Sequence, residues 1–135
     1  MIRIATNDDV EWLADIAEEC YPVKIDKEAS LAWLRNNIGK NNRVIALKGE
    51  HSAVLAFVCT FFWRPGYVSL ETQMFCGRRT RQGTLESLQL LKFLDDIRKE
   101  LGYNALIINT SITDLLPFAK RLGAKLLGQS YILGD

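Results

Sequence analysis

Apolar positions in the first 40 residues recur at the three- and four-residue spacing of amphipathic helices, after a short stretch in which apolar and polar residues alternate. The segment from Thr6 to Asp9 is a capping box, because an acid follows a threonine by three residues. Pro22 ends the first helix, and Gly39 ends the second. This part of the chain predicts a strand at residues 2–4 and helices at residues 10–20 and 26–38.

The middle of the chain consists of continuous or alternating apolar runs separated by turn signals, which is typical of strands. Short turns between consecutive strands predict an antiparallel meander. In the third of these strands, the alternation places Ser69, Glu71, Gln73 and Phe75 on one face. The predicted strands cover residues 44–47, 53–63 and 67–75.

The second half begins with a basic loop at residues 77–83, and a strongly amphipathic helix follows it. The run from Ala105 to Ile108 is apolar on both faces, as in a central strand. The predicted elements are a helix at 84–101 with its apolar stripe at Leu88, Leu91, Leu94, Ile97 and Leu101, a strand at 104–110, a helix at 114–122, and short strands at 125–127 and 130–133. The order predicts a single α/β (α+β) domain over residues 1–135, with a mixed, mostly antiparallel sheet and helices on both faces.

Composition and charge exclude several classes of protein. The 135 residues are 48% hydrophobic, with 17 basic against 16 acidic side chains, which disfavours a protein that coats nucleic acid through a broad basic surface. We expect neither a membrane span nor a signal peptide. The three cysteines form no metal-binding pattern, and the single histidine, His51, lies in a predicted turn, so we expect no metal and no Ser-His-Asp site. A reducing cytoplasm fits these thiols.

The loop before the long helix is a candidate anion site. The first turn of a helix has unpaired backbone N–H groups and a partial positive charge, and Arg78, Arg79 and Arg81 add side chains that can hold two phosphate oxygens each. The alternative is that these arginines are merely solvated.

The element order, the opening sequence and this strand–loop–helix unit resemble the GNAT-type N-acetyltransferases, and in particular short phage-encoded members. The motif of that family, Gln/Arg-x-x-Gly-x-Gly/Ala, corresponds to residues 82–87, where Leu85 replaces the central glycine. The resemblance implies acetyl-CoA as co-substrate. It implies a cofactor site formed by Phe75, Cys76, Gly77, Arg79, Arg81, Gln82, Gly83, Thr84, Leu85, Glu86 and Ser87.

The resemblance also implies the catalytic groups. A carboxylate on the fourth strand commonly accepts the proton of the amine, and Glu71 is the candidate. The tyrosine that often protonates the leaving thiolate from the last helix is replaced here by Ala119, so we assign this role to Tyr131. No cysteine shows a basic partner other than the arginines, which favours direct attack of the amine on the thioester without a covalent enzyme intermediate.

The acceptor and the partners are less defined. Residues 1–28 carry a net charge of −5 and the rest of the chain +6, which is compatible with a cationic amine acceptor, small molecule or protein, or with a solvated helix face. The aromatic run from Phe57 to Trp63 predicts core packing or a homodimer interface, with an acceptor pocket as the alternative. The competing function is a non-catalytic GNAT-fold structural or binding protein, such as a phage virion or assembly component, and a nucleic-acid binder is third.

Overall fold

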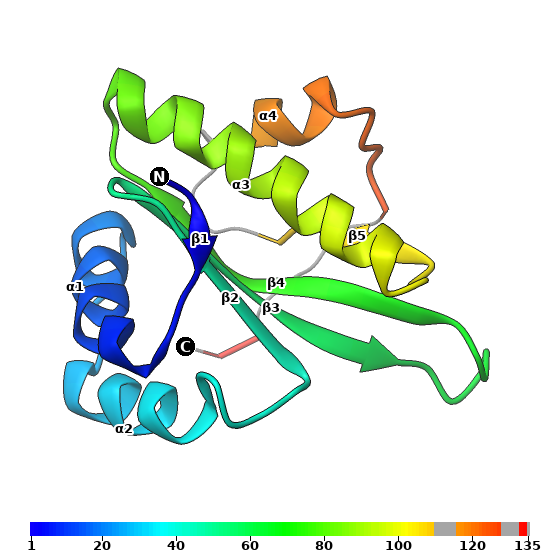
Figure 1. Cartoon of the computed structure of the whole chain (residues 1–135), viewed down its shortest axis with the longest axis horizontal. Helices are drawn as coiled ribbons and strands as arrows, with labels where there is room; N and C mark the ends of the chain where they lie inside the picture. Colours follow the sequence, from blue (N-terminus) through cyan, green and yellow to red (C-terminus); the bar gives the residue numbers. More distant parts are fainter. Residues whose placement is uncertain (110–115, 128–132, 135) are drawn as a thin grey trace.

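A five-stranded sheet forms the centre of the molecule (Figure 1). The computed structural model describes residues 1–109, 116–127, 133 and 134. The elements in chain order are β1 (Arg3–Ile4), the 3-10 turn η1 (Asn7–Asp9), α1 (Val10–Cys20), α2 (Lys27–Asn37), β2 (Val44–Lys48), β3 (Ser52–Thr60), β4 (Val68–Gly77), α3 (Arg81–Glu100), β5 (Ala105–Ile107) and α4 (Leu116–Arg121). None of the described helices is both long and apolar enough to cross a bilayer.

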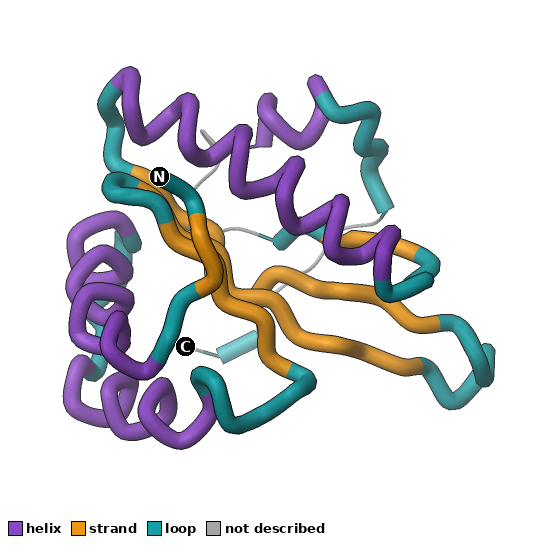
Figure 2. The backbone as a smooth tube through the Cα atoms, in the orientation of Figure 1, coloured by secondary structure: helices purple, strands orange, loops and turns teal. Residues whose placement is uncertain are grey.

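The strands lie in the sheet in their chain order, β1 to β5. Neighbours are antiparallel from β1 to β4, whereas β4 and β5 are parallel. The crossover that a parallel pair requires is α3, the longest helix, which lies across the sheet (Figure 2). The predicted mixed, mostly antiparallel sheet is therefore confirmed.

Helices cover both faces of the sheet, and the end of β4 shows how. Successive strand residues point to opposite faces. The side chain of Cys76 lies near Cys20 at the end of α1, whereas a Cβ at Gly77 would meet Ser87 of α3. Hence α1 and α2 pack on one face and α3 and α4 on the other (Figure 1). Fully buried leucines, among them Leu13, Leu70 and Leu91, fill the core between the layers.

Two strand predictions need correction. The second meander strand ends at Thr60 rather than at residue 63, because a longer loop with Gly66 at φ +89° connects it to β4. The rings of Phe61, Phe62 and Trp63 therefore cluster in that loop, where Phe62 is 90% and Trp63 68% exposed. Residues 125–127 form no strand.

Strand β4 contains a bulge that the sequence pattern did not reveal. Leu55 pairs with Met74 and Ala56 with Thr72, so Gln73 is the extra residue. Beyond it the alternation is reversed, and Phe75 faces α3 instead of sharing a face with Glu71. The predicted polar face is therefore limited to Ser69 and Glu71.

The long helix also differs from its prediction. It begins at Arg81, three residues earlier than expected, because the Thr80 hydroxyl accepts a hydrogen bond from the Gly83 amide at 3.0 Å and acts as the N-cap. Its buried stripe starts with the small residues Gly83 and Ser87. Leu90 is fully buried in place of Leu88, and Leu101 is half exposed.

Candidate functional site: the β4–α3 turn and the open edge of β4

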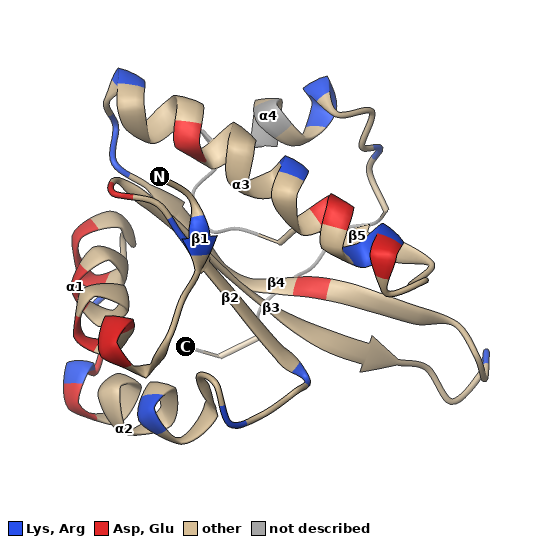
Figure 3. Cartoon of the chain, in the orientation of Figure 1, with Lys and Arg blue, Asp and Glu red and all other residues tan. Residues whose placement is uncertain are grey.

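The first turn of α3 presents a polar, exposed surface beside the end of β4. The Thr80 hydroxyl satisfies only the Gly83 amide, and a helix start leaves further N–H groups without helical partners, here those of Arg81 and Gln82. Basic residues colour this turn blue in Figure 3, and the first turn of α3 contains no acidic residue. The exposed members of the predicted cofactor site are Arg79, Arg81, Gln82, Thr84 and Leu85.

Small residues bring this turn against the strand. A Cβ on Gly83 would lie 2.0 Å from the Arg78 carbonyl oxygen, and one on Gly77 would lie 2.4 Å from the Ser87 hydroxyl oxygen. The Ser87 hydroxyl in turn donates to the Gly83 carbonyl at 2.7 Å. Glycine at 83 and a small residue at 87 are thus required by packing, whereas the exposed Leu85 has no such constraint.

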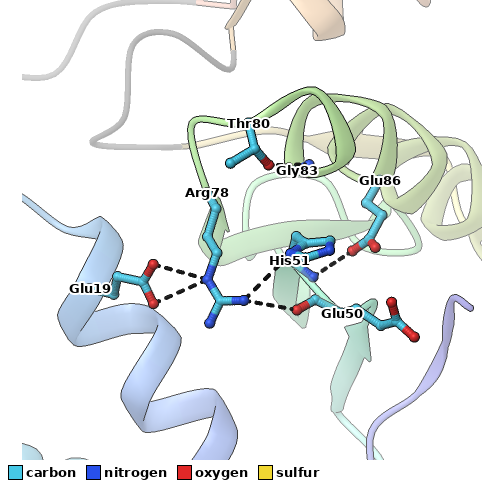
Figure 4. Close-up of polar contacts among 7 residues, drawn as sticks. All are labelled: Glu19, Glu50, His51, Arg78, Thr80, Gly83 and Glu86. Carbon is cyan, nitrogen blue, oxygen red and sulfur yellow. Dashed lines mark hydrogen bonds and ion pairs between the residues drawn. The ribbon is translucent and has the colours of Figure 1, made fainter.

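Glu86 and Arg78 face the β2–β3 turn rather than the outer surface of the helix start (Figure 4). The Glu86 carboxylate accepts from the His51 amide at 2.8 Å and from the Ser52 hydroxyl at 3.1 Å. Burial opposes its ionisation, but these bonds outweigh burial and lower the pKa of Glu86. Because this carboxylate holds the β2–β3 turn, the predicted cofactor contact of Glu86 can come only from its other groups.

The same turn gathers three groups with metal-ligating atoms, Glu50, His51 and Glu86, within 4.8 Å of one another. The guanidinium of Arg78 lies 3.5 Å from Nδ1 of His51 and donates to the Glu50 carbonyl at 3.2 Å. A fixed positive charge at that distance works against a bound cation. The groups instead form a hydrogen-bonded support behind the β4–α3 turn.

Half of the acidic residues in the N-terminal region take part in ion pairs, which bears on the expected cationic acceptor. The acids of α1 are red in Figure 3, beside basic residues of neighbouring elements. The pairs are Asp9 with Arg3, Glu11 with Arg35, Asp15 with Lys27, and Glu19 with Arg78. Since half of the eight acids have a basic partner, the charge of this region stabilises packing and gives little support to an acceptor site.

Strands β4 and β5 separate immediately after Glu71. Their pairing covers Ser69 to Glu71, and the next residue, Thr72, uses its hydroxyl to donate to the Asn109 carbonyl at 2.8 Å and to accept from the Asn109 amide at 2.7 Å. Beyond this point β4 continues to Gly77 paired with β3, and no described strand pairs with its other edge. The resulting edge leads directly to the first turn of α3.

One residue missed by sequence reasoning lies on this stretch. The Tyr21 hydroxyl, at the end of α1, accepts a hydrogen bond from the Phe75 amide at 3.3 Å. Burial raises the pKa of Tyr21 to about 12, so it carries its proton at neutral pH and can donate it to a further acceptor. Only proximity in space relates Tyr21 to β4, so no local pattern could reveal it. The predicted donor, Tyr131, lies outside the described residues.

Glu71 lies on the α1–α2 face at the point of separation, half buried, and the Ser69 hydroxyl donates to it at 3.4 Å. Its cross-strand partner Phe57 stacks on Trp33 of α2 at 5.5 Å between ring centroids. Burial and the Glu71 carboxylate raise the pKa of Cys59 to about 11, so this nearby thiol remains protonated and is a poor nucleophile. Glu71 is thus placed next to the diverging strands, on the side opposite α3.

The side chains of Phe75 and Cys76 are fully buried. Their predicted contribution to a cofactor site is therefore restricted to backbone groups of the β4 edge. Together with Gly77, they connect the point of strand separation to the β4–α3 turn.

Comparison with known proteins gives matches in structure only. No family model and no curated protein matches the sequence. A transcriptional regulator from Bacillus halodurans C-125 is similar with a TM-score of 0.81 at 18% identity, over 100% of this chain and 99% of its own. A predicted acetyltransferase from Clostridium acetobutylicum, solved with acetyl-CoA, has a TM-score of 0.76 at 15% identity, over 99% of this chain and 95% of its own.

A ribosomal-protein-alanine N-acetyltransferase from Brucella melitensis biovar Abortus 2308 has a TM-score of 0.71 at 15% identity, over 100% of this chain and 99% of its own. These similarities show that the chain has the mixed α/β fold of the GNAT acetyltransferases. A shared fold does not by itself assign a function, which depends on the residues of the site.

Proposed function

We propose that this protein binds acetyl-CoA at the β4–α3 turn and transfers the acetyl group to a primary amine. One observation carries the proposal: the open edge of β4 leads from the half-buried Glu71 to an exposed, arginine-flanked helix start. The arrangement offers one anionic group and one anion-binding surface at opposite ends of the same edge. Acetyl-CoA has the matching chemistry, with a thioester at one end and phosphates at the other.

The helix start suits the pyrophosphate. Backbone N–H groups of Arg81 and Gln82 point out of the first turn, where the helix dipole favours an anion. The guanidinium of Arg81 adds charge-assisted hydrogen bonds. Along the edge from Gln73 to Gly77, the Phe75 amide donates to Tyr21, and the backbone groups of the other residues are of the kind that pair with the amides of the pantetheine arm.

The chemistry requires a base and a proton donor. The amine nitrogen attacks the thioester carbonyl carbon, the carbon–sulfur bond breaks, and the electron pair leaves with the thiolate. Glu71 accepts the proton lost by the amine, directly or through water. The thiolate takes a proton from Tyr131, to which we assign the role of the tyrosine that Ala119 replaces, or from Tyr21, whose hydroxyl contacts β4.

The test is release of free CoA thiol from acetyl-CoA over a panel of primary amines. We expect turnover with at least one amine and a loss of about a hundredfold or more in Glu71→Gln, the usual scale for a general base. Glu100→Gln, at the exposed end of α3, is the matched control and should behave as the parent. Equal turnover in Glu71→Gln and the parent would reject Glu71 as the base.

For partners, we propose a homodimer through the loop at residues 61–67. Phe62 and Trp63 expose large apolar surfaces there, and Arg64 stacks on Tyr67 at 4.5 Å from its ring centroid. Exposed aromatic clusters of this kind are typical of interfaces.

A further inference from the structure

The end of α1 contacts the end of β4 through three consecutive residues. In one outer contact, Nε of Arg78 donates to the Glu19 carboxylate at 2.9 Å. In the other, the Phe75 amide donates to the Tyr21 hydroxyl at 3.3 Å. Between them, the thiols of Cys20 and Cys76 are close enough for each to shift the pKa of the other. The pairs are Glu19 with Arg78, Cys20 with Cys76, and Tyr21 with Phe75. Because the flanking contacts hold both backbones, the two thiols are kept side by side.

The two thiols of this pair are not equivalent. Cys76 is fully buried in β4, whereas Cys20 is only partly buried at the end of its helix. The neighbouring Cys76 thiol lowers the pKa of Cys20, and the Arg78 guanidinium acts in the same direction, against burial and Glu19. The neighbouring Cys20 thiol and its own burial raise the pKa of Cys76. Of the two sulfurs, Cys20 therefore ionises more readily than Cys76.

From this geometry we propose that Cys20 and Cys76 are a peroxide-responsive thiol pair that closes into a reversible disulfide between α1 and β4. A partly buried thiol that ionises more readily, held next to a second thiol, is the arrangement that oxidation to a disulfide requires. The inference does not depend on acetyl transfer, because it uses neither Glu71 nor the helix start.

The reaction balances with hydrogen peroxide as the oxidant. The Cys20 thiolate attacks one peroxide oxygen, the O–O bond breaks, and hydroxide leaves, so that Cys20 becomes a sulfenic acid. The Cys76 sulfur then attacks the Cys20 sulfur, a disulfide bond forms, and the sulfenic oxygen leaves as water with the Cys76 proton. Overall, two thiols are oxidised, one peroxide is reduced, and two waters form. A dithiol reductant reverses the change by thiol–disulfide exchange.

The third cysteine supplies the internal control. Cys59 is half buried on β3, and burial raises its pKa to about 11. The Cys59→Ala variant leaves only the proposed pair, so any intramolecular disulfide in it is assigned without ambiguity. In the parent protein at neutral pH, iodoacetamide should alkylate Cys20 at least about tenfold faster than Cys59, since the thiolate is the reactive form.

The experiment treats folded Cys59→Ala and parent protein with stoichiometric hydrogen peroxide, followed by intact mass and peptide mapping without reduction. We expect a loss of two hydrogen atoms, a cross-link between the Cys20 and Cys76 peptides, an unchanged oligomeric size and a higher melting temperature that dithiothreitol reverses. Retention of added oxygen on Cys20, a cross-link between two chains, or faster reaction at Cys59 would each overturn the proposal. Because the mapping is done on protein that retains both thiols, it does not require a core substitution to fold.

Discussion

The close packing of α3 on β4 can be tested by a double-mutant cycle at two small residues. In Gly77→Ala, the new Cβ would lie 2.4 Å from the Ser87 hydroxyl oxygen and 3.3 Å from the Gly83 carbonyl oxygen. The hydroxyl cannot rotate away without losing its 2.7 Å bond to that carbonyl. We therefore expect Gly77→Ala to lower the free energy of unfolding by about 1–3 kcal/mol, the usual cost of overpacking.

Ser87→Ala removes the obstructing oxygen. Alone, it should cost about 1 kcal/mol for the lost hydrogen bond. In a protein that already carries Ser87→Ala, Gly77→Ala should lower the free energy of unfolding by about 1 kcal/mol less than it does in the parent. The two substitutions therefore couple favourably. Urea unfolding of all four proteins measures this coupling. Effects that add to within about 0.3 kcal/mol would refute the packing argument, since residues in contact do not act independently.

Three further predictions concern other parts of the molecule. The Arg3 guanidinium bonds both carboxylate oxygens of Asp9 and, against burial, lowers its pKa from 3.8 to about 2. That shift corresponds to about 2 kcal/mol of stability, present above the unfolded pKa and lost as the pH falls from 3.8 toward 2. Asp9→Asn should lose this stability in urea unfolding at pH 7, whereas Asp8→Asn should not. Equal losses of unfolding free energy in the two variants would contradict the assignment of the stability to the Arg3–Asp9 pair. Tyr21→Phe should weaken acetyl-CoA binding about two- to tenfold in calorimetry, the value of one hydrogen bond, and an unchanged affinity would remove Tyr21 from the site. Trp63→Ser should shift the sedimentation of the protein from dimer to monomer, and a parent protein that is already monomeric at the same concentration would contradict the proposed interface.

The sequence was informative wherever local periodicity decides the structure. The two N-terminal helices match their predicted bounds because Thr6, Pro22 and Gly39 are strong local signals. The element order and the fold class followed from the same patterns.

Features that depend on contacts between distant segments could not be read in this way. The bulge at Gln73 leaves no trace in the alternation, because it becomes visible only when β3 is paired alongside. The early start of α3 depends on a single hydroxyl, that of Thr80. Cys20 in α1 and Cys76 in β4 are separated along the chain by one helix, α2, and two strands, β2 and β3, and only the packing of α1 on β4 brings them together.

The candidate site residues also differ in whether local sequence patterns or contacts between distant segments place them. Glu71, Arg81 and Gly83 were found because strand, loop and helix follow one another directly in the sequence. The role of Glu86 in holding the β2–β3 turn, and the position of Tyr21 on β4, arise from tertiary contacts. Motif reasoning therefore locates the helix start and misses the groups that support it.

The measurement that tests the central claim most directly is a calorimetric titration of acetyl-CoA into the parent protein, Arg81→Ala and Lys92→Ala. Lys92 is exposed further along the same helix, so its removal changes the net charge equally without touching the first turn. We predict one site per chain, a loss of affinity of about tenfold or more in Arg81→Ala, as for a charge-assisted phosphate contact, and parent-like binding in Lys92→Ala. No binding by the parent, or equal binding by all three proteins, would contradict an acetyl-CoA site at the start of α3.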